Sequence, residues 1–167
     1  MMTPLLKQSL ALASLSLVFA GCVSVNIGGS KAERSKGVRV SAPSAPFTEI
    51  EGSRADGAWK NSSNGNSISY LSTCNDPADP SLETATNELF SDLKAMIVKK
   101  QATTTFSGRE ALDTEVDGKM EGIATRVRSV VFKKNGCLYT LSLVGVAAKF
   151  DEDRSKFDQF LTAFEAP

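Results

Sequence analysis

The side chains that could carry chemistry in this sequence are carboxylates, arginines and three cysteines, because the chain contains no histidine. Without an imidazole, neither a Ser-His-Asp triad nor a Cys-His dyad nor an HExxH zinc site can form. The GxSxG, P-loop and dinucleotide-binding patterns are also absent. We therefore expect no catalytic residues, no metal site and no cofactor, and we predict that the protein is not an enzyme.

Two acidic segments remain as candidate cation sites. Asp151, Glu152 and Asp153 could supply several of the oxygen ligands that Ca²⁺ prefers. Three adjacent acids before a helix are more often helix-capping residues and solvated charge. The segment Asp76-Pro77-Ala78-Asp79 has the same two interpretations.

A pair of arginines and a pair of carboxylates lie on neighbouring predicted strands. Arg126 and Arg128 are two positions apart, so their guanidinium groups share one face and could bind a carboxylate or phosphate. A half-exposed strand explains the same spacing. Glu115 and Asp117 form a similar pair, but glycosidase chemistry requires a cleft and a set separation that a sequence does not show.

Cys22 stands at the end of a segment that is typical of export. An uncharged run of 12 residues, Ser9–Ala20, is too short to cross about 30 Å of hydrocarbon but suits a secretory signal. Phe19-Ala20-Gly21-Cys22 resembles the lipobox of bacterial lipoproteins, although Phe19 replaces the usual leucine. That resemblance implies cleavage before the cysteine and its acylation, for example with palmitate. We predict a signal peptide over 1–21 and lipidation of Cys22; an ordinary secreted protein is the alternative.

A lipid anchor also predicts a location. Each buried CH₂ group contributes about 0.8 kcal/mol, so several acyl chains hold a protein firmly on a membrane. Val23, rather than aspartate, follows the cysteine. The usual sorting rule for such lipoproteins then predicts the outer membrane of the bacterial cell envelope, with the protein facing the periplasm.

The other two cysteines lie in the exported part of the chain. Cys74 and Cys137 would be in a compartment that oxidises thiols, so we expect a disulfide between them. The bond would close a loop of about 63 residues, and on the chain-entropy model such a cross-link stabilises the fold by roughly 4 kcal/mol. Two buried free thiols are the alternative. Neither cysteine has another close by, which excludes a CxxC redox site, and two thiols without histidine do not make a typical zinc site.

Composition divides the chain into three parts. After the signal peptide, 22–46 contains the lipidated cysteine and a stretch rich in Gly, Ser, Ala and Pro, which predicts a flexible tether. The tether has a net charge of +3 and the predicted domain, 47–167, a net charge of −4. The whole chain has 19 basic and 19 acidic residues, so no excess of positive charge favours nucleic acid. The tether's lysines and arginines could attract anionic head groups or merely keep the linker soluble.

Hydrophobic spacing predicts two helices and a sheet in the domain. A first helix opens at Asp79-Pro80 and continues its apolar stripe to Ile97, and a second runs over 153–164. Strands are predicted at 47–51, 67–73, 102–106, 111–116, 123–132 and 137–146. Asn135-Gly136 favours a hairpin turn between the last two strands. This pattern predicts an α+β fold: an antiparallel β-sheet flanked by helices on both faces, an α/β/α sandwich.

The order of these elements resembles the PsbP-like superfamily over roughly 47–167. The residues that carry the resemblance are Trp59 after the first strand, Tyr139-x-Leu141, Phe150 and Phe157-x-x-Phe160-Leu161-x-x-Phe164. The superfamily includes the photosystem II extrinsic protein, a eukaryotic Ran-GTPase-binding protein and many bacterial lipoproteins. The resemblance implies a binding or assembly module without enzymatic activity, and it provides no catalytic motif to transfer.

These observations favour a non-enzymatic envelope lipoprotein that acts as a protein-binding or assembly module. Such a module needs an apolar or charged surface patch for its envelope protein partner, whose identity the sequence does not give. The alternative is a small-ligand or lipid-binding carrier in the periplasm, which needs a continuous apolar pocket between the sheet and the helices. An enzyme would need a carboxylate with a strongly perturbed pKa in a cleft.

Overall fold

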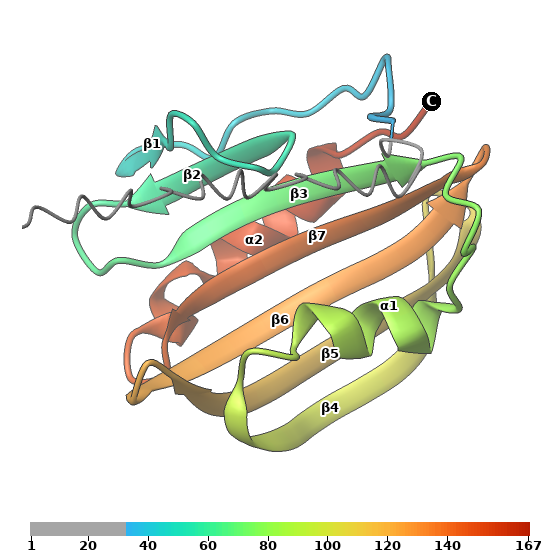
Figure 1. Cartoon of the computed structure of the whole chain (residues 1–167). Helices are drawn as coiled ribbons and strands as arrows, with labels where there is room; N and C mark the ends of the chain where they lie inside the picture. The colour runs from blue at the N-terminus through green and yellow to red at the C-terminus, as the bar shows by residue number, and fades with distance from the viewer. Residues whose placement is uncertain (1–32) are drawn as a thin grey trace, which may run out of the picture.

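The computed structural model describes residues 33–167, which form one antiparallel sheet of seven strands with two helices. The strands are β1 (Phe47–Glu49), β2 (Gly57–Asn61), β3 (Ser67–Cys74), β4 (Lys94–Phe106), β5 (Arg109–Met120), β6 (Ile123–Lys134) and β7 (Cys137–Val146). The helices are α1 (Leu82–Leu89) and α2 (Arg154–Ala163), which follows a short 3₁₀ helix, η1 (Phe150–Asp153). Their order in the sheet is β1-β2-β3-β7-β6-β5-β4 (Figure 1). The predicted antiparallel sheet is confirmed.

The four consecutive strands β4, β5, β6 and β7 are joined by tight turns and form one continuous meander. Asn135-Gly136 connects β6 to β7 with φ angles of 51° and 73°, as the sequence predicts. Ser107-Gly108 makes the same kind of turn between β4 and β5, with φ angles of 51° and 73°. Two consecutive positive φ values define the type I′ turn, whose twist matches that of the flanking strands.

The first helix is much shorter than the sequence predicts. It begins after Ser81, whose hydroxyl accepts a hydrogen bond of 3.1 Å from the Thr84 amide, and it ends at Leu89. The prediction of a helix reaching Ile97 is wrong, because the chain turns after Phe90 and enters β4 at Lys94. Strand β2 was not among the predicted strands.

The two helices pack against different apolar clusters of the sheet. Figure 1 shows α1 in front of β5 and β6, and α2 behind β3 and β7. The segment that follows α1 contributes Phe90 and Leu93 to a small cluster with Val116 and Val127. The larger core contains Trp59, Ile68, Phe132, Tyr139, Leu141, Leu143, Phe150, Phe157, Phe160 and Phe164. The predicted amphipathic helix over 153–164 is therefore confirmed, within one residue at each end, and its phenylalanines face the sheet.

The segment before β1 lies on the domain. Arg34 donates a hydrogen bond of 2.7 Å to the Ser72 carbonyl, and the Ser35 and Tyr139 hydroxyls share one of 2.7 Å. Arg39 exchanges two backbone hydrogen bonds with Glu165, of 3.0 and 2.9 Å. The folded part of the chain therefore begins before residue 47, within the stretch predicted as a tether. The predicted signal peptide, the lipidated Cys22 and the rest of the tether lie outside the described residues.

The structure contains the predicted disulfide. Cys74 ends β3, Cys137 begins β7, and the two residues are paired directly across the strands with Cα atoms 4.0 Å apart. The bond therefore links two neighbouring strands in the middle of the sheet.

Within residues 33–167, neither helix has the length and apolarity needed to cross a membrane.

Candidate functional site

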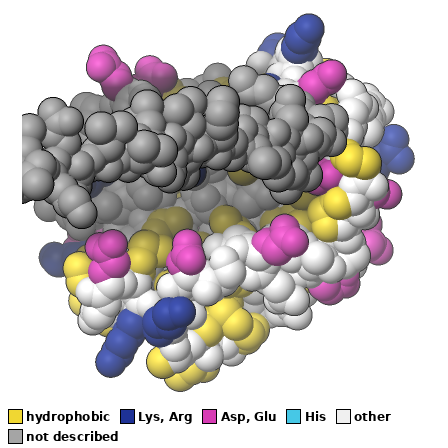
Figure 2. All heavy atoms as spheres, in the orientation of Figure 1, with side chains coloured by type: hydrophobic (Ala, Val, Ile, Leu, Met, Phe, Trp, Pro, Cys, Tyr) yellow, Lys and Arg dark blue, Asp and Glu magenta, His cyan; other side chains and the backbone are white. Residues whose placement is uncertain are grey.

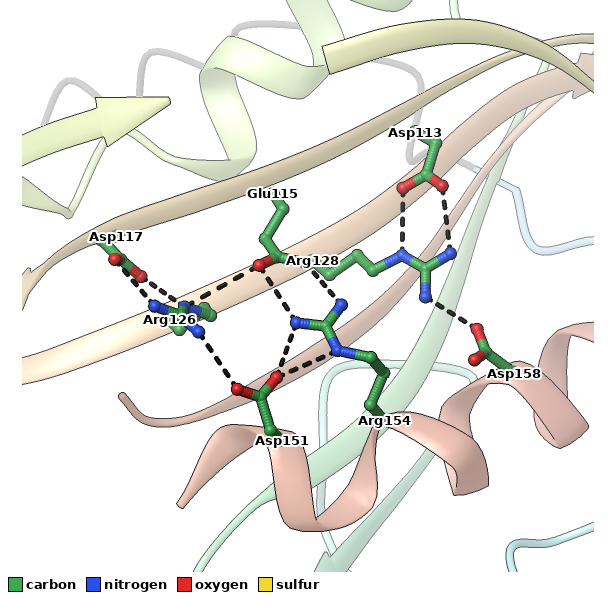
Figure 3. A network of polar contacts seen from close by, with 8 residues as sticks. All are labelled: Asp113, Glu115, Asp117, Arg126, Arg128, Asp151, Arg154 and Asp158. Atoms are coloured by element: carbon green, nitrogen blue, oxygen red, sulfur yellow. Dashed lines mark hydrogen bonds and ion pairs between the residues drawn. The ribbon is translucent and has the colours of Figure 1, made fainter. Parts of the chain in front are cut away.

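The candidate arginines and carboxylates meet on the face of the sheet that packs against η1 and α2. Strand register pairs Asp117 with Arg126 and Glu115 with Arg128, so all four side chains point to the same face. Figure 3 shows these side chains, together with Asp113, pointing towards acids and an arginine of η1 and α2. Residue types and spacing indicate the four strand residues, but not that Asp113, Arg154 and Asp158 join them.

Paired hydrogen bonds connect the two strands. Arg126 donates to both carboxylate oxygens of Asp117, with Nε–Oδ1 and Nη2–Oδ2 distances of 2.6 and 2.9 Å. Arg128 binds Asp113 in the same way, at 3.1 and 3.0 Å, and reaches Asp158 of α2 at 2.7 Å. Each strand arginine is therefore engaged by carboxylates of the protein itself.

Arg154 completes the network from the helix side. It donates to both oxygens of Glu115, at 2.6 and 3.1 Å, and to Asp151 (Figure 3). Its guanidinium carbon lies 5.3 Å from the centre of the Phe150 ring, within the range of a cation–π contact. Only 11% of the Glu115 side chain is exposed. These contacts fasten η1 and α2 to the sheet, and the guanidinium groups are already used, which argues against an anion-binding site.

Contacts within the network favour the ionised forms of the Asp117 carboxylate and the Arg154 guanidinium. Hydrogen bonds from Arg126 hold the pKa of the Asp117 carboxyl below its usual range, against a smaller opposing effect of burial. The hydrogen bonds with Glu115 raise the pKa of the Arg154 guanidinium above its ordinary value. A general acid that works near neutral pH needs a raised carboxyl pKa, which is the opposite shift to that of Asp117.

Replacing Asp117 with asparagine is expected to destabilise the protein by about 1–2 kcal/mol at pH 7. A carboxyl whose pKa is lowered by folding stabilises fully above its unfolded pKa of about 3.9 and loses that contribution as the pH falls through the folded value. The difference between the variant and the wild type should therefore shrink towards zero as the pH falls below the lowered, folded-state pKa of Asp117. Urea unfolding at pH 7 and at low pH measures it. Asp92→Asn, at an exposed position, is the control, and an equal loss at both pH values would contradict the assignment.

The three side chains of the acidic candidate Asp151-Glu152-Asp153 lie in three different environments. Asp151 joins the arginine network, and Glu152 accepts a hydrogen bond of 2.9 Å from Lys149. Asp153 is buried and makes no side-chain capping bond to α2. Among residues 33–167 no group of three His, Cys, Asp or Glu side chains is placed to hold a metal ion.

Asp153 instead binds three asparagines of the β2–β3 connection. Asn61 donates to both carboxylate oxygens at 3.1 and 3.0 Å, Asn64 donates at 2.7 Å, and Asn66 donates at 2.8 Å. Gly145 makes room for Asn66, because a Cβ atom there would lie 1.8 Å from the Asn66 Oδ1. The cluster joins the β2–β3 turn to the start of α2, and its carboxylate is surrounded by donors rather than by cation ligands.

The Asp76–Asp79 candidate borders a pocket of about 550 Å³ at the end of the β6–β7 hairpin. Asp79 accepts a hydrogen bond from Lys133, and Asp76 accepts one of 2.9 Å from the Ala78 amide. Much of the pocket wall is polar or charged, including Asn75, Asp76, Asp79, Arg109, Lys133, Lys134 and Asn135. A lipid carrier would need an apolar cavity between the sheet and a helix. This pocket lies at the end of a hairpin instead, and much of its wall is polar or charged.

An exposed apolar surface lies at the opposite end of the sheet. Large hydrophobic side chains are exposed where β4 begins, at the β5–β6 turn and at the end of β7; we call Met96, Ile97, Val98, Met120, Ile123 and Val146 the β4-end patch. Figure 2 shows hydrophobic side chains gathered over the lower edge of the molecule, with lysines or arginines beside them. Ile97 is 64% exposed, the highest value among these residues. This patch is not apparent from the sequence, because the spacing of Met96-Ile97 places both residues in the buried stripe of the predicted first helix.

No family model matches this chain, and no curated protein matches it either. Among solved structures, the chain is similar to LpqN of Mycobacterium tuberculosis, described as involved in cell envelope biogenesis, with a TM-score of 0.58 and 17% identity over 84% of this chain and 88% of that one. It is also similar to cyanobacterial PsbP (CyanoP) from Synechocystis sp. PCC 6803, with a TM-score of 0.55 and 15% identity over 89% of this chain and 99% of that one. At these identities the likeness concerns the fold alone, and the chain has a PsbP-like fold.

Proposed function

We propose that the protein is a non-enzymatic module of the bacterial cell envelope that binds or assembles with a protein partner. The observation that carries this proposal is the β4-end patch, since grouped exposed hydrophobic side chains mark interaction sites. The chemistry of the rest of the domain supports it, because the candidate arginines and the buried Glu115 are engaged with each other. In this proposal the two helices cover opposite faces of the sheet and leave the β4 side open to a partner.

The envelope location rests on two observations of different kinds. The sequence carries a signal-like run and a lipobox-like Ala20-Gly21-Cys22, and the similar fold of LpqN belongs to a protein described as involved in cell envelope biogenesis. We propose a lipid anchor at Cys22 in the outer membrane, with the domain in the periplasm.

The position of Glu33 gives this anchor a geometric consequence. Glu33 pairs with Cys74, at the disulfide end of β3, whereas the β4-end patch lies at the opposite end of the sheet. Glu33 is eleven positions after Cys22, and such a length of chain spans at most about 40 Å. An anchor at Cys22 therefore keeps the disulfide end within about 40 Å of the membrane, whereas the patch at the other end of the sheet can lie farther from it.

The test is photo-crosslinking in living cells with the crosslinking amino acid at Ile97. A protein partner should be trapped there and not from Ser155, an exposed control position on α2. In the same cells, the wild type should incorporate labelled palmitate and Cys22→Ser should not, because the thiol that is acylated is gone. No crosslinked product from Ile97 would argue against the binding function, and a wild-type protein that incorporates no labelled palmitate would exclude the lipid anchor.

A further inference from the structure

Strand β4 is an unusually long and open sheet edge. Within residues 33–167, β4 is the last strand on its side of the sheet, and nearly all of its 13 residues are exposed. The opposite edge is β1, which is only 3 residues long. An edge strand presents unpaired backbone N–H and C=O groups, to which an extended segment of another chain can add.

The two halves of β4 differ in regularity and charge. Over Lys94–Lys100 the pairing with β5 contains two register shifts, and three exposed lysines interrupt the sequence. Bulges and lysines are the devices by which natural edges avoid indiscriminate pairing. From Gln101 to Phe106 the register with β5 is regular and the strand carries no charge. The second half of β4 is therefore the part of the edge that can accept another strand.

The turn that precedes β5 determines which backbone groups are available. Phe106 and Arg109 flank a two-residue type I′ turn, so they form a hydrogen-bonded pair, and Thr104 and Ala102 repeat that arrangement. The alternate residues Gln101, Thr103 and Thr105 then direct their N–H and C=O groups away from β5. Three residues with outward backbone groups provide six sites for ladder hydrogen bonds along a stretch of six residues.

The charges beside this ladder indicate the partner's chemistry. Lys99 and Lys100 are exposed next to Gln101, and Lys94 lies beyond them, although the predicted domain as a whole has a net charge of −4. An added strand with carboxylates at the positions facing Lys99 and Lys100 would pair its charges with these lysines. Binding of β4 from a second copy of the chain would not supply such charge pairs. Full overlap of two antiparallel β4 strands brings Lys100 against Lys100 and places both bulged halves in the ladder.

We propose that residues Gln101–Phe106 of β4 bind an extended, acidic segment of a partner protein by antiparallel strand addition, with its carboxylates against Lys99 and Lys100. This inference rests on the proposed protein-binding function and names its binding mode and the class of partner segment. The β4-end patch continues the same edge past the lysines, so apolar residues that follow the acidic ones would find an apolar surface.

The first experiment uses a defined peptide and the predicted mature chain, residues 22–167, with Cys22→Ser so that it carries no lipid. The peptide TVTVTVEE is designed for antiparallel addition: its six β-forming residues face Gln101–Phe106, and its two glutamates face Lys100 and Lys99. The peptide TVTVTVKK is the matched control. In amide NMR titrations, TVTVTVEE should shift the signals of Gln101, Thr103 and Thr105 and bind with a Kd on the order of 100 µM. TVTVTVKK should bind about tenfold more weakly. No shifts along β4, or equal affinity for both peptides, would overturn the proposal.

Two variants separate pairing of the backbone from attraction between charges. Thr103→Pro removes an outward N–H at an edge position, where proline is tolerated, and should abolish binding while the cooperative unfolding transition is kept. The exposed-charge variant Lys99→Glu/Lys100→Glu keeps the backbone and should reverse the preference between the two peptides. If β4 signals shift with protein concentration alone, and Thr103→Pro stops this, the occupant is a second copy and the proposal is wrong.

Photo-crosslinking from Ile97 in cells distinguishes failure of this site from failure of the proposed function. A partner that is trapped by the wild type and lost with Thr103→Pro would support strand addition when the peptide results agree. A partner trapped equally by both would overturn the β4 site and leave the binding function standing. No partner in either case would count against the proposed function itself and, with it, the site.

Discussion

Replacing Asp153 with alanine is expected to lower the free energy of unfolding by about 3–5 kcal/mol, because three asparagine amides lose their acceptor at once. Asn61 and Asn66 are buried, with 3% and 0% of their surface exposed, so water cannot easily replace the lost carboxylate. A domain of this size is stable by roughly 5–15 kcal/mol, and the loss is a large share of that. Urea unfolding followed by the fluorescence of Trp59 measures it, since Trp59 is the one tryptophan and packs against Phe160.

Two matched variants test the explanation of this loss. Glu152→Ala removes the neighbouring carboxylate, which is about half exposed, and should have a much smaller effect. Asp153→Asn keeps the shape of the side chain but turns one acceptor into a donor, so it should fall between alanine and the wild type. Equal losses for the Glu152 and Asp153 variants would show that the buried asparagine cluster is not the cause.

Removing the disulfide is expected to cost roughly 4 kcal/mol. The bond closes a loop of 63 residues, and cross-linking a loop of this size chiefly lowers the conformational entropy of the unfolded chain. The measurement compares urea unfolding of the oxidised wild type with the double variant Cys74→Ala/Cys137→Ala. Reduced wild-type protein is the matched control, because it keeps both side chains and should lose most of the same stability. A loss of less than about 1 kcal/mol in both would contradict the expected loop-closure effect.

The parts of the fold that follow local rules were predictable from the sequence. The second helix was predicted because Phe157, Phe160 and Phe164 recur at helical spacing, and the structure places all three in the core. The Asn135-Gly136 turn was predicted because both residues tolerate positive φ. In these cases the preference of a few neighbouring residues agrees with the requirements of the whole fold.

The first helix shows where local rules fail. Leu93 and Met96-Ile97 continue the helical spacing of the preceding residues, so the pattern alone predicts a longer helix. In the structure Leu93 packs with Val116 and Val127, and Ile97 is paired with Asp117 of β5. Pairing with a strand that comes later in the sequence decides the conformation there, and no local spacing reports it.

The candidate site was predictable only in part for the same reason. Glu115, Asp117, Arg126 and Arg128 could be identified from their types and spacing. Arg154 joins them because α2, which packs against β7, brings its side chain within reach of Glu115 on β5, and this contact depends on the tertiary arrangement. The exposed edge of β4 could not be recognised at all until the order of the strands was known.

The disulfide also has a mechanical consequence for a protein held at one end. If a bound partner pulls against an anchor at Cys22, the load enters the domain at Glu33, beside Cys74. The contacts of Arg34, Ser35 and Arg39 would be loaded first, followed by β1, β2 and β3. Unravelling from this end can extend the chain by about 140 Å, the contour length of Glu33–Cys74, before it reaches the covalent link to β7. The disulfide then acts as a stop that limits extension and keeps β4, β5 and β6, including the proposed binding edge, inside a closed covalent loop.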